Sequence, residues 1–392
     1  MNFFDDADLI IVGAGFYGMT IAERAASEGF RVAILEKRDH IGGNAYSYAD
    51  PATGIEIHKY GPHIFHTNNE RIFEYLSRFT EWETYEQRVW TMSRGRVYPL
   101  PINLATIGSF AGRAMTPDEA RAWVKENAGA ITQPNSLEEK AIALIGRPLY
   151  EALVRGYTLK QWQTDPQLLP PDIISRLPVR YNYDNRYFND THQCLPRRGY
   201  TAIFERMSAS ERISVHLGVD WFDVRWARTR VPVVYTGPID RFFDYRLGVL
   251  GWRTIDLSFE TLEIEDFQGC PVMNYADADV PWTRISEFKH FRPWREALPK
   301  TVIAREYSRA ANVKDDPYYP VNLVEDKRKY LGYRELARDE KDVVFGGRLG
   351  AYRYLDMHQA VAAALNAWER RLRPRLTRGE ALADVDELDD VA

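Results

Sequence analysis

The 392-residue sequence has few cysteines, no long apolar run and no large excess of one charge sign. Its two cysteines, Cys194 and Cys270, form no CxxC pair and have no metal-ligand spacing, so we expect no disulfide framework. No apolar run approaches the roughly 20 residues of a membrane span, and the first predicted strand begins too early to leave a signal peptide. The net charge of −5 offers nothing global to attract nucleic acid or an anionic membrane. These absences predict a cytoplasmic protein in which a local basic cluster would have to bind any anionic substrate.

Aromatic residues, in contrast, are abundant, at 13% of the chain with 23 Tyr and 10 Trp. They fit either a tyrosine-rich core and surface or a cleft that stacks a base and hydrogen-bonds phosphates through phenols. Composition alone leaves both open.

The motif G-x-G-x-x-G lies in the first predicted βαβ unit, within residues 8–44. An apolar run leads into the glycines, a helical pattern follows, and a second apolar run ends at Glu36. Glycines at this spacing permit a tight turn and let a pyrophosphate approach the backbone. The helix N-terminus attracts phosphate, and the carboxylate binds ribose hydroxyls. The unit therefore predicts a dinucleotide site.

The residues after Glu36 indicate which dinucleotide binds. Segment 37–44, KRDHIGGN, contains a second Gly-Gly turn, and it resembles the second phosphate-contacting segment of FAD-binding flavoproteins of the amine-oxidase type. NAD-binding domains have no need of such a turn. FAD is therefore the expected cofactor.

Predicted strands at 8–12, 31–35, 231–235 and 343–345 recur along the chain, and the segments between them read as insertions. The expected fold class is α/β: a discontinuous Rossmann-like FAD-binding domain with an inserted helical lobe and an antiparallel β-sheet substrate lobe. The predicted boundaries are 1–80, 200–245 and 335–375 for the FAD-binding domain, 105–165 for the helical lobe, 81–104, 170–199 and 246–334 for the substrate lobe, and 379–392 for a disordered acidic tail.

Local signals place further elements. Segment 88–100 alternates around a turn and predicts a β-hairpin. Helices are predicted to begin at Thr116, with proline in the first position, and at Ser136, with a capping box. Segment 163–175 contains three prolines and predicts a long surface loop of the kind that forms lids.

Three histidines, His58, His63 and His66, fall close together, and the last two have the i, i+3 spacing of a helical metal site. Gly61 and Pro62 predict a turn instead, and no carboxylate or thiol is suitably spaced to complete a zinc site. We therefore expect no metal and a polar turn against the flavin ring.

Nine segments, in order along the chain, resemble the UDP-galactopyranose mutases of the prokaryotic type. The resemblance extends from Asp8 to about Arg370. The segments are GAGFYG, EKRDHIGGNAY, HKYGPHIFHTN, GYTLKQW, RLPVRYNYDNRYF, YTGPID, VPWTRISEFKHF, PYYPVN and GGRLGAYRYLDMHQ.

The resemblance implies interconversion of UDP-galactopyranose and UDP-galactofuranose without net redox change. In that family N5 of reduced FAD attacks the anomeric carbon and UDP leaves; the sugar ring opens as an iminium and recloses, and UDP returns. The resemblance also implies a homodimer and an external reductant, for which NAD(P)H is expected although no second dinucleotide site is seen.

Within the family pattern, Arg176 and Arg284 form the diphosphate-binding pair, since fixed-charge forks match phosphate geometry. Arg176 ends the predicted lid, so lid closure would place it on the substrate. These arginines and His66, expected to sense the redox state of the flavin, are the expected catalytic residues. The other implied substrate contacts are the phosphate-binding phenols Tyr187, Tyr318 and Tyr354, the uridine-pocket residues Tyr157, Thr158 and Trp162, and the polar residues Asn274 and Gln87.

The family pattern also implies the cofactor contacts. They are Gly13, Gly15, Tyr17 and Gly18 at the pyrophosphate turn, Glu36 at the ribose, Lys37, Gly43 and Asn44 in the second segment, Val219 at the adenine through its backbone amide, and His63, Ile64, Arg348, Asp356, Met357 and His358 at the flavin end. A helix that starts near Asp356 would stabilise negative charge on the reduced flavin.

Three residues depart from the family pattern. Gln87 stands where enteric members carry Asn, while Gln163 and Cys194 each replace a glycine. The last two put the flexibility of the lid in doubt and leave the arginine pair untouched.

Three alternatives stay open. An FAD-dependent oxidoreductase of the amine-oxidase type shares the cofactor motifs, but it would need an apolar pocket rather than paired arginines. A non-catalytic, FAD-dependent sugar-nucleotide binder would show no turnover when reduced. A mutase for a related nucleotide sugar would keep the chemistry and change the sugar.

Overall fold

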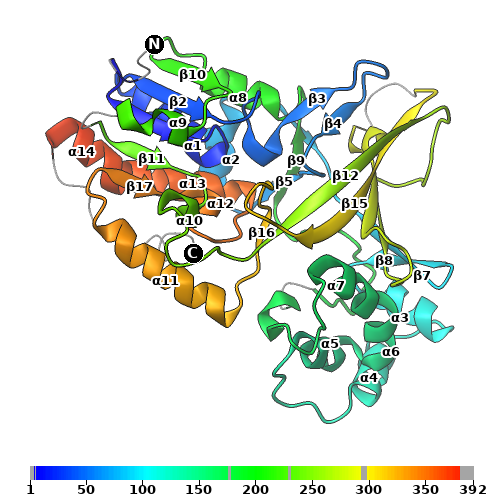
Figure 1. Ribbon diagram of the computed structural model, residues 1–392. Coiled ribbons are helices and arrows are strands. Elements are labelled where there is room, and N and C mark those ends of the chain that lie inside the picture. Colours follow the sequence, from blue (N-terminus) through cyan, green and yellow to red (C-terminus); the bar gives the residue numbers. More distant parts are fainter. Residues whose placement is uncertain (1–3, 5, 175–177, 228–230, 293–297, 380–392) are drawn as a thin grey trace.

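The computed structural model describes residues 4, 6–174, 178–227, 231–292 and 298–379. This part of the chain contains a parallel sheet covered by helices, a large and mostly antiparallel sheet, and a helical lobe beside the second sheet (Figure 1). The α/β fold class predicted from the sequence is confirmed. The domain boundaries stay a prediction, and the acidic tail lies outside the described residues.

The parallel sheet has five strands in the order β10-β2-β1-β11-β17. They are β10 (Ile213–Leu217), β2 (Val32–Glu36), β1 (Leu9–Val12), β11 (Val233–Tyr235) and β17 (Val343–Phe345). Successive side chains of a strand point to opposite faces. Leu9 and Ile11 therefore pack in one core with α1 (Phe16–Ser27) and α13 (Met357–Ala367), while Ile10 packs in another with Trp221. Both faces are covered, which explains why β2, β1, β11 and β17 are almost uninterrupted apolar runs, whereas the edge strand β10 alternates apolar and polar residues.

The second sheet has seven strands in the order β16-β12-β15-β14-β13-β7-β8. They are β16 (Tyr319–Pro320), β12 (Trp252–Leu262), β15 (Thr301–Ala310), β14 (Arg284–Glu287), β13 (Val272–Tyr275), β7 (Val89–Ser93) and β8 (Arg96–Leu100). Only β13 and β7 among these described pairs run parallel. The hairpin predicted at 88–100 is confirmed as β7–β8.

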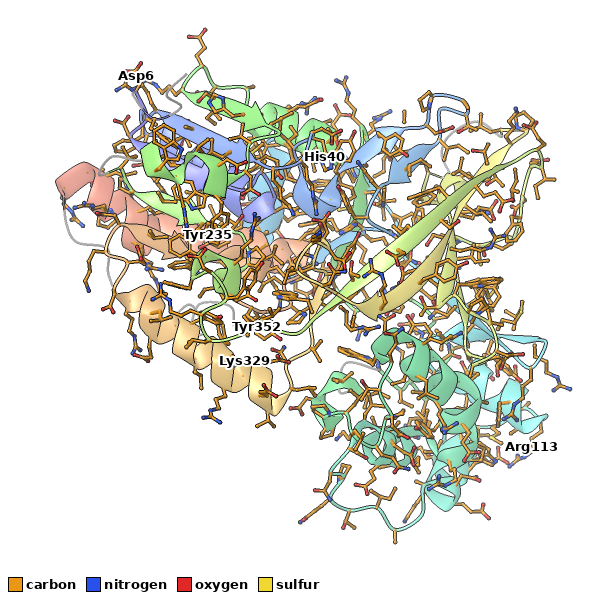
Figure 2. The ribbon with its side chains drawn as sticks, in the orientation of Figure 1. Asp6, His40, Arg113, Tyr235, Lys329 and Tyr352 are labelled. Carbon is orange, nitrogen blue, oxygen red and sulfur yellow. The ribbon has the colours of Figure 1, made fainter. Side chains whose placement is uncertain are left out.

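The helical lobe has an apolar core of its own, which includes Ile107, Ile142 and Leu149. Its helices are α3 (Leu104–Ala111), α4 (Pro117–Ala128), α5 (Leu137–Ile145), α6 (Arg147–Leu149) and α7 (Arg155–Trp162), with the π-helical turn η2 (Tyr150–Val154) before α7. In Figure 2, Arg113 lies in this lobe, well apart from Tyr235 at the end of β11.

Two details of this lobe correct the predictions. The helix start predicted at Thr116 is confirmed, and a capping box forms there. The capping box predicted at Ser136 is incomplete, because the Glu139 carboxylate accepts from Asn135 N–H (2.7 Å) instead of from Ser136 N–H. The segment predicted as a surface loop at 163–175 is anchored in its described part. Leu169 and Ile174 are buried in the lobe core.

The remaining elements join these parts. A pair of strands, β3 (Ser47–Ala49) and β4 (Glu56–His58), lies near a three-stranded sheet of β5 (Phe65–Thr67), β9 (His192–Pro196) and β6 (Trp82–Thr84). The other helices are α2 (Glu70–Ser77), α8 (Thr201–Met207), α9 (Trp221–Val224), α10 (Ile239–Phe242), α11 (Val324–Arg338), α12 (Gly347–Gly350) and α14 (Arg373–Arg378). His66 lies in strand β5, so the turn predicted there ends earlier. Across the described residues, no helix has the length and apolar character to cross a bilayer.

A buried ion pair connects β4 with the segment that follows β14. The Arg292 guanidinium contacts the Glu56 carboxylate, which also accepts from Ser47 Oγ (2.5 Å). Both charged side chains are less than 9% exposed. Burying one of them alone would leave a charge in a medium of low dielectric constant.

We predict that Arg292→Met lowers the free energy of unfolding by about 3–5 kcal/mol, because Glu56 is left buried without a counter-charge. Urea denaturation at neutral pH measures this loss. The double variant Glu56→Gln/Arg292→Met removes both charges and should lose less. An equal or larger loss in the double variant would contradict the explanation.

Candidate active site

Backbone geometry requires the first and the last glycine of the first motif. Gly13 has a φ of +104°, and a Cβ there would lie 2.1 Å from Thr236 Oγ1. A Cβ on Gly18 would lie 2.1 Å from the Gly13 carbonyl oxygen. A larger residue at either position would displace the turn between β1 and α1.

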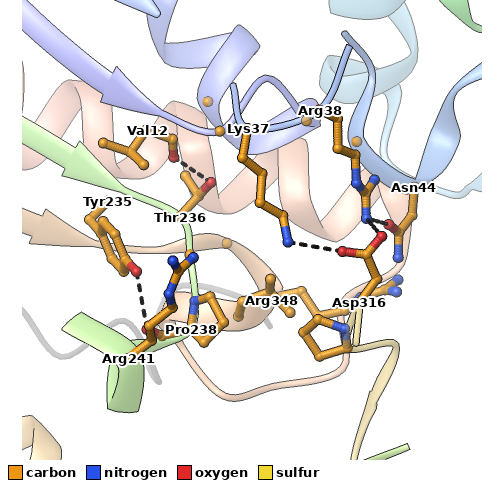
Figure 3. Close-up of a pocket in the computed structure, with 18 of the residues that line it drawn as sticks. Val12, Lys37, Arg38, Asn44, Tyr235, Thr236, Pro238, Arg241, Asp316 and Arg348 are labelled. Carbon is orange, nitrogen blue, oxygen red and sulfur yellow. Dashed lines mark hydrogen bonds and ion pairs between the residues drawn. The ribbon is translucent and has the colours of Figure 1, made fainter. Parts of the chain in front are cut away.

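The two glycine turns of the sequence face each other. A Cβ built on Gly43, whose φ is +56°, would lie 3.1 Å from Gly15 Cα. Beside these turns is a cavity, shown in Figure 3, at the carboxyl ends of the parallel strands. Its lining includes the predicted cofactor residues Gly13, Gly15, Tyr17, Gly18, Glu36, Lys37, Gly43, Asn44, His63, Val219, Arg348 and Met357.

Glu36 ends β2 and is buried at the edge of this cavity. Its carboxylate accepts from Ala14 N–H (2.8 Å) and from Arg38 N–H (3.0 Å). These bonds fix the orientation of the carboxylate. Val219 also lies here, but its N–H donates to Glu36 O (3.0 Å), so a contact from Val219 to a base would use its carbonyl group rather than the expected amide N–H.

Basic side chains cross the cavity toward a loop of the antiparallel sheet. Asp316 accepts from Lys37 Nζ (3.0 Å) and lies 2.9 Å from Arg38 Nη2, as Figure 3 shows. Arg38 also donates to Asn44 Oδ1 (3.0 Å) and covers the Tyr60 ring at 4.2 Å. Burial raises the pKa of the Asp316 carboxyl, but Arg38 and Lys37 prevail and hold it below its usual value.

Some of the residues predicted at the flavin end line the cavity, and the others lie behind its lining. Arg348 donates to Leu355 O (2.7 Å) and lies over the Tyr354 ring at 5.1 Å. Asp356 caps α13 with a capping box, so the helix start predicted there is confirmed. Ile64, Asp356 and His358 are outside the cavity lining, and Ile64 packs against the main core.

The histidines have separate partners. His58 Nδ1 accepts from His63 N–H (3.0 Å), and His63 Nδ1 lies 2.7 Å from Gly61 O. His66 bonds Asp190 Oδ2 (2.6 Å) and stacks on Phe188. Only His63 of the three lines the cavity.

One face of the antiparallel sheet carries a row of polar side chains that we call the polar row. Register pairs Tyr319 with Arg253, Arg253 with Ala310, Glu306 with Arg284, and Arg284 with Asn274. Paired residues share a face, and Ser308 shares that of Glu306 because it is two positions away. The polar row therefore consists of Tyr319, Arg253, Ser308, Glu306, Arg284 and Asn274.

Helix α7 covers the polar row. Ser308 Oγ donates to Gln161 O (2.7 Å), and Arg253 Nη1 donates to Gln163 Oε1 (3.3 Å). The predicted substrate residues Tyr157, Thr158 and Trp162 belong to this helix, and Thr158 is buried. Trp162 packs against the core of the helical lobe.

Arg284 lies among three phenols. Its Nε is 3.0 Å from Glu306 Oε2, and Tyr157, Tyr319 and Tyr187 also act on its charge. Burial lowers the pKa of Arg284, but Glu306 prevails and holds the pKa well above its usual value. Burial raises the pKa of both Tyr157 and Tyr319, so both phenols stay protonated at neutral pH.

Other predicted substrate residues lie near the polar row or connect it to the cavity. Gln87 O accepts from Tyr187 N–H (2.8 Å), and the Gln87 Oε1 and Asn274 Oδ1 atoms are buried without partners among the described residues. Tyr318 O lies 3.4 Å from Arg348 Nη1, and the Tyr319 and Tyr354 rings stack at 5.8 Å. Arg176 falls outside the described residues.

The sequence analysis missed Arg253, Glu306 and Tyr319. Arg253 is 3% exposed and, within the described part of the chain, has no carboxylate partner. Burial lowers the pKa of Arg253 to about 10, with help from Arg309. The available signal was the alternation of charged and apolar residues in β12 and β15. It indicates which residues of each strand share a face of the sheet, but not which residues of other strands lie beside them.

The departures from the family pattern have structural counterparts. Gln163 ends α7 with a φ of +50°, a conformation that glycine adopts more easily, and its amide oxygen accepts from Arg253 and from Ala310 N–H (3.3 Å). Cys194 is buried in β9, and burial raises the pKa of its thiol to about 12. Its side chain is therefore an apolar core element.

Side chains of metal-binding types gather elsewhere, at Asp266, Glu287 and His290. Buried Glu287 already accepts from Phe267 N–H, Gln268 N–H and Thr301 Oγ1, and His290 Nε2 lies 3.2 Å from Asp266. Ion pairs and hydrogen bonds account for this cluster, and we assign no metal to it.

The residues at the cavity fit a dinucleotide. The glycine cradle leaves space that any Cβ would fill, a buried carboxylate ends β2, and a helix begins beside Met357. A model of the NAD(P)-binding Rossmann-like domain matches residues 11–79, and a family model described as UDP-galactopyranose mutase matches residues 152–354.

A probable UDP-galactopyranose mutase of Klebsiella pneumoniae is 45% identical over 362 residues, which cover 92% of this chain and 94% of the relative. The chain belongs to the UDP-galactopyranose mutase family. A dTDP-fucopyranose mutase of Escherichia coli is 40% identical, with coverage of 91% and 96%. A crystal structure of reduced UDP-galactopyranose mutase matches with a TM-score of 0.72 at 14% identity, covering 95% of this chain and 98% of that one; this likeness shows the fold alone.

The buried histidines of this family member generate a prediction about pH. Burial lowers the pKa of His58 from 6.5 to about 3. The unfolded chain therefore takes up a proton below pH 6.5 that the folded chain refuses, and stability falls as the pH falls. We expect a loss of up to about 3 kcal/mol between pH 6.5 and pH 4 from this residue.

The variant His58→Asn keeps an acceptor for the His63 N–H and has no proton to gain, so it should lose less stability over this range. Urea denaturation at several pH values measures the difference. His192→Asn is the matched control, since His192 is partly exposed and bonds the Glu70 carboxylate. An unchanged pH dependence in His58→Asn would contradict the assignment.

Proposed function

We propose that this chain interconverts UDP-galactopyranose and UDP-galactofuranose on a bound, reduced FAD. The observation that carries the proposal is the 45% identity to the Klebsiella relative over nearly the whole chain. The cavity with its two glycine turns supports FAD as the dinucleotide, and the polar row beside it supports a phosphorylated substrate.

When bound and reduced, FAD supplies the nucleophilic nitrogen that displaces UDP from the anomeric carbon without net oxidation. The task of the chain is to bind the diphosphate and stabilise its charge as it leaves. Arg284 suits this role because its guanidinium is a planar, permanently charged fork. Glu306 forms an ion pair with that fork, with Oε2 3.0 Å from Nε.

The neighbouring phenols would act as donors. Tyr157 and Tyr319 remain protonated because burial raises their pKa, so each can donate a hydrogen bond to a phosphate oxygen. Arg253 offers another positive charge, which is buried and which Glu306 does not offset. We propose Arg176 as the partner of Arg284, from its position in the family pattern.

We retain four further proposals from the sequence: a homodimer, a cytoplasmic location, an external NAD(P)H reductant and a redox-sensing role for His66. The bond between His66 and Asp190 and the neighbouring His358 ring support a role for His66 near the flavin end.

A second candidate is the same reaction on dTDP-fucopyranose, favoured by the 40% identity to the Escherichia coli mutase. That substrate lacks the 6-hydroxyl of galactose and the 2′-hydroxyl of the ribose. Comparing kcat/KM for the two nucleotide sugars decides between them.

We predict that the purified yellow protein converts UDP-galactofuranose to the pyranose only after anaerobic reduction with dithionite. Chromatography of the nucleotide sugars measures the product. Equal conversion without reduction, or a stoichiometric oxidised product, would refute the proposed chemistry. A reduced enzyme that converts only the dTDP-sugar would support the second candidate.

We also predict that Arg284→Ala lowers kcat/KM by about 10²–10³-fold while FAD remains bound, because a charge on the leaving diphosphate goes uncompensated. Arg305→Ala is the matched control, since Arg305 lies on the opposite face of β15 in an ion pair with Glu260. Wild-type turnover in Arg284→Ala would refute the role assigned to it.

A further inference from the structure

The ammonium group of Lys160 donates all of its hydrogen bonds to backbone carbonyl oxygens. On α7, its Nζ donates to the carbonyl oxygens of Tyr275 (2.7 Å), Asp277 (2.8 Å) and Trp282 (3.0 Å). Burial lowers the pKa of Lys160 to about 8, although the charges of Asp277 and Asp279 act to raise it. The amine is therefore still an ammonium at neutral pH. An ammonium has three donors, and all three are satisfied here.

These three carbonyl groups belong to the connection between β13 and β14, which carry Asn274 and Arg284 of the polar row. Tyr275 ends β13, and Trp282 lies two positions before Arg284. The ammonium therefore binds both ends of the connection at once. It therefore holds the chain two positions before Arg284, which is the first residue of β14.

Close packing of the backbone also ties α7 to this connection. A Cβ on Gly156 would lie 2.2 Å from Ala276 O and 3.0 Å from Ala278 N, so only glycine fits there. Asp277 extends the network by accepting from Arg94 N–H (2.8 Å) in the β7–β8 turn. The helix, the connection and the hairpin thus form one bonded unit.

Lys160 and Tyr157 are three positions apart on α7, so they share a helix face. Ser308 of the polar row donates to Gln161 O (2.7 Å), the residue after Lys160, so α7 lies directly against the polar row. Lys160 itself has no free donor left for a ligand.

We propose that Lys160 is a positioning residue that orients Arg284 for the diphosphate by holding the β13–β14 connection against α7. The inference rests on the proposed function, in which Arg284 binds that diphosphate. It predicts that Lys160 affects diphosphate binding only through Arg284.

The experiment is a double-mutant cycle in which UDP binding to the FAD-loaded protein is measured by calorimetry at pH 7. We expect Lys160→Met to weaken UDP binding by about tenfold, and Lys160→Met/Arg284→Ala to bind no more weakly than Arg284→Ala alone. Lys289→Met is the matched control, because Lys289 bonds the carbonyl oxygens of Glu265 and Leu298 after the other end of β14. It should bind UDP as the wild type does.

Wild-type UDP affinity in folded Lys160→Met, or additive losses in the double variant, would overturn the inference. Failure of the wild type to bind UDP would refute the proposed function instead, and wild-type affinity in Arg284→Ala would refute the role of that arginine. If Lys160→Met does not fold, Lys160→Gln, which keeps a donor, takes its place with the same expected non-additivity. An unchanged FAD content separates loss of positioning from general unfolding.

Discussion

The close approach of backbone to backbone at the carboxyl edge of the parallel sheet is the constraint on which the site depends. Gly13 lies against Thr236, and Gly43 lies against Gly15. The turns of the two glycine motifs therefore form one shared cradle. Parallel strands end at the same edge, which brings Glu36 to this cradle as well. Helix α13 begins beside this cradle, because β17 and α12 precede it along the chain and lead there. An added side chain at Gly13 or Gly43 would separate the elements.

Features coded within a few residues could be predicted from the sequence. The glycine spacing, the acid that ends β2, the β7–β8 hairpin and the cap at Thr116 each need only local geometry. The Ser136 box shows the limit of local rules, because the Glu139 carboxylate has two backbone donors within reach and bonds the preceding one. The capping propensity of these residues indicates that a helix cap forms, but not which backbone N–H donates to the carboxylate.

The polar row could not be predicted, since it depends on register between distant segments. Arg253 and Tyr319 become neighbours only when β12 pairs with β16, and Glu306 meets Arg284 only when β15 pairs with β14. A shift of one residue would turn either side chain to the other face. The bridge from Lys37 to Asp316, which spans 279 positions, has the same origin. The family resemblance found Arg284 through its motif and could not find its partner.

The polar groups differ in how completely they are satisfied. Lys160 and Glu287 have a partner for every charge-bearing atom, as buried ions require. Along the polar row, by contrast, Arg253 Nε and Asn274 Oδ1 are buried without partners among the described residues. A buried polar atom without a hydrogen-bond partner destabilises the folded state, because it has lost its hydrogen bonds to water. Under the proposed function, a bound nucleotide sugar would offset part of this cost if it supplied partners to such atoms of the polar row.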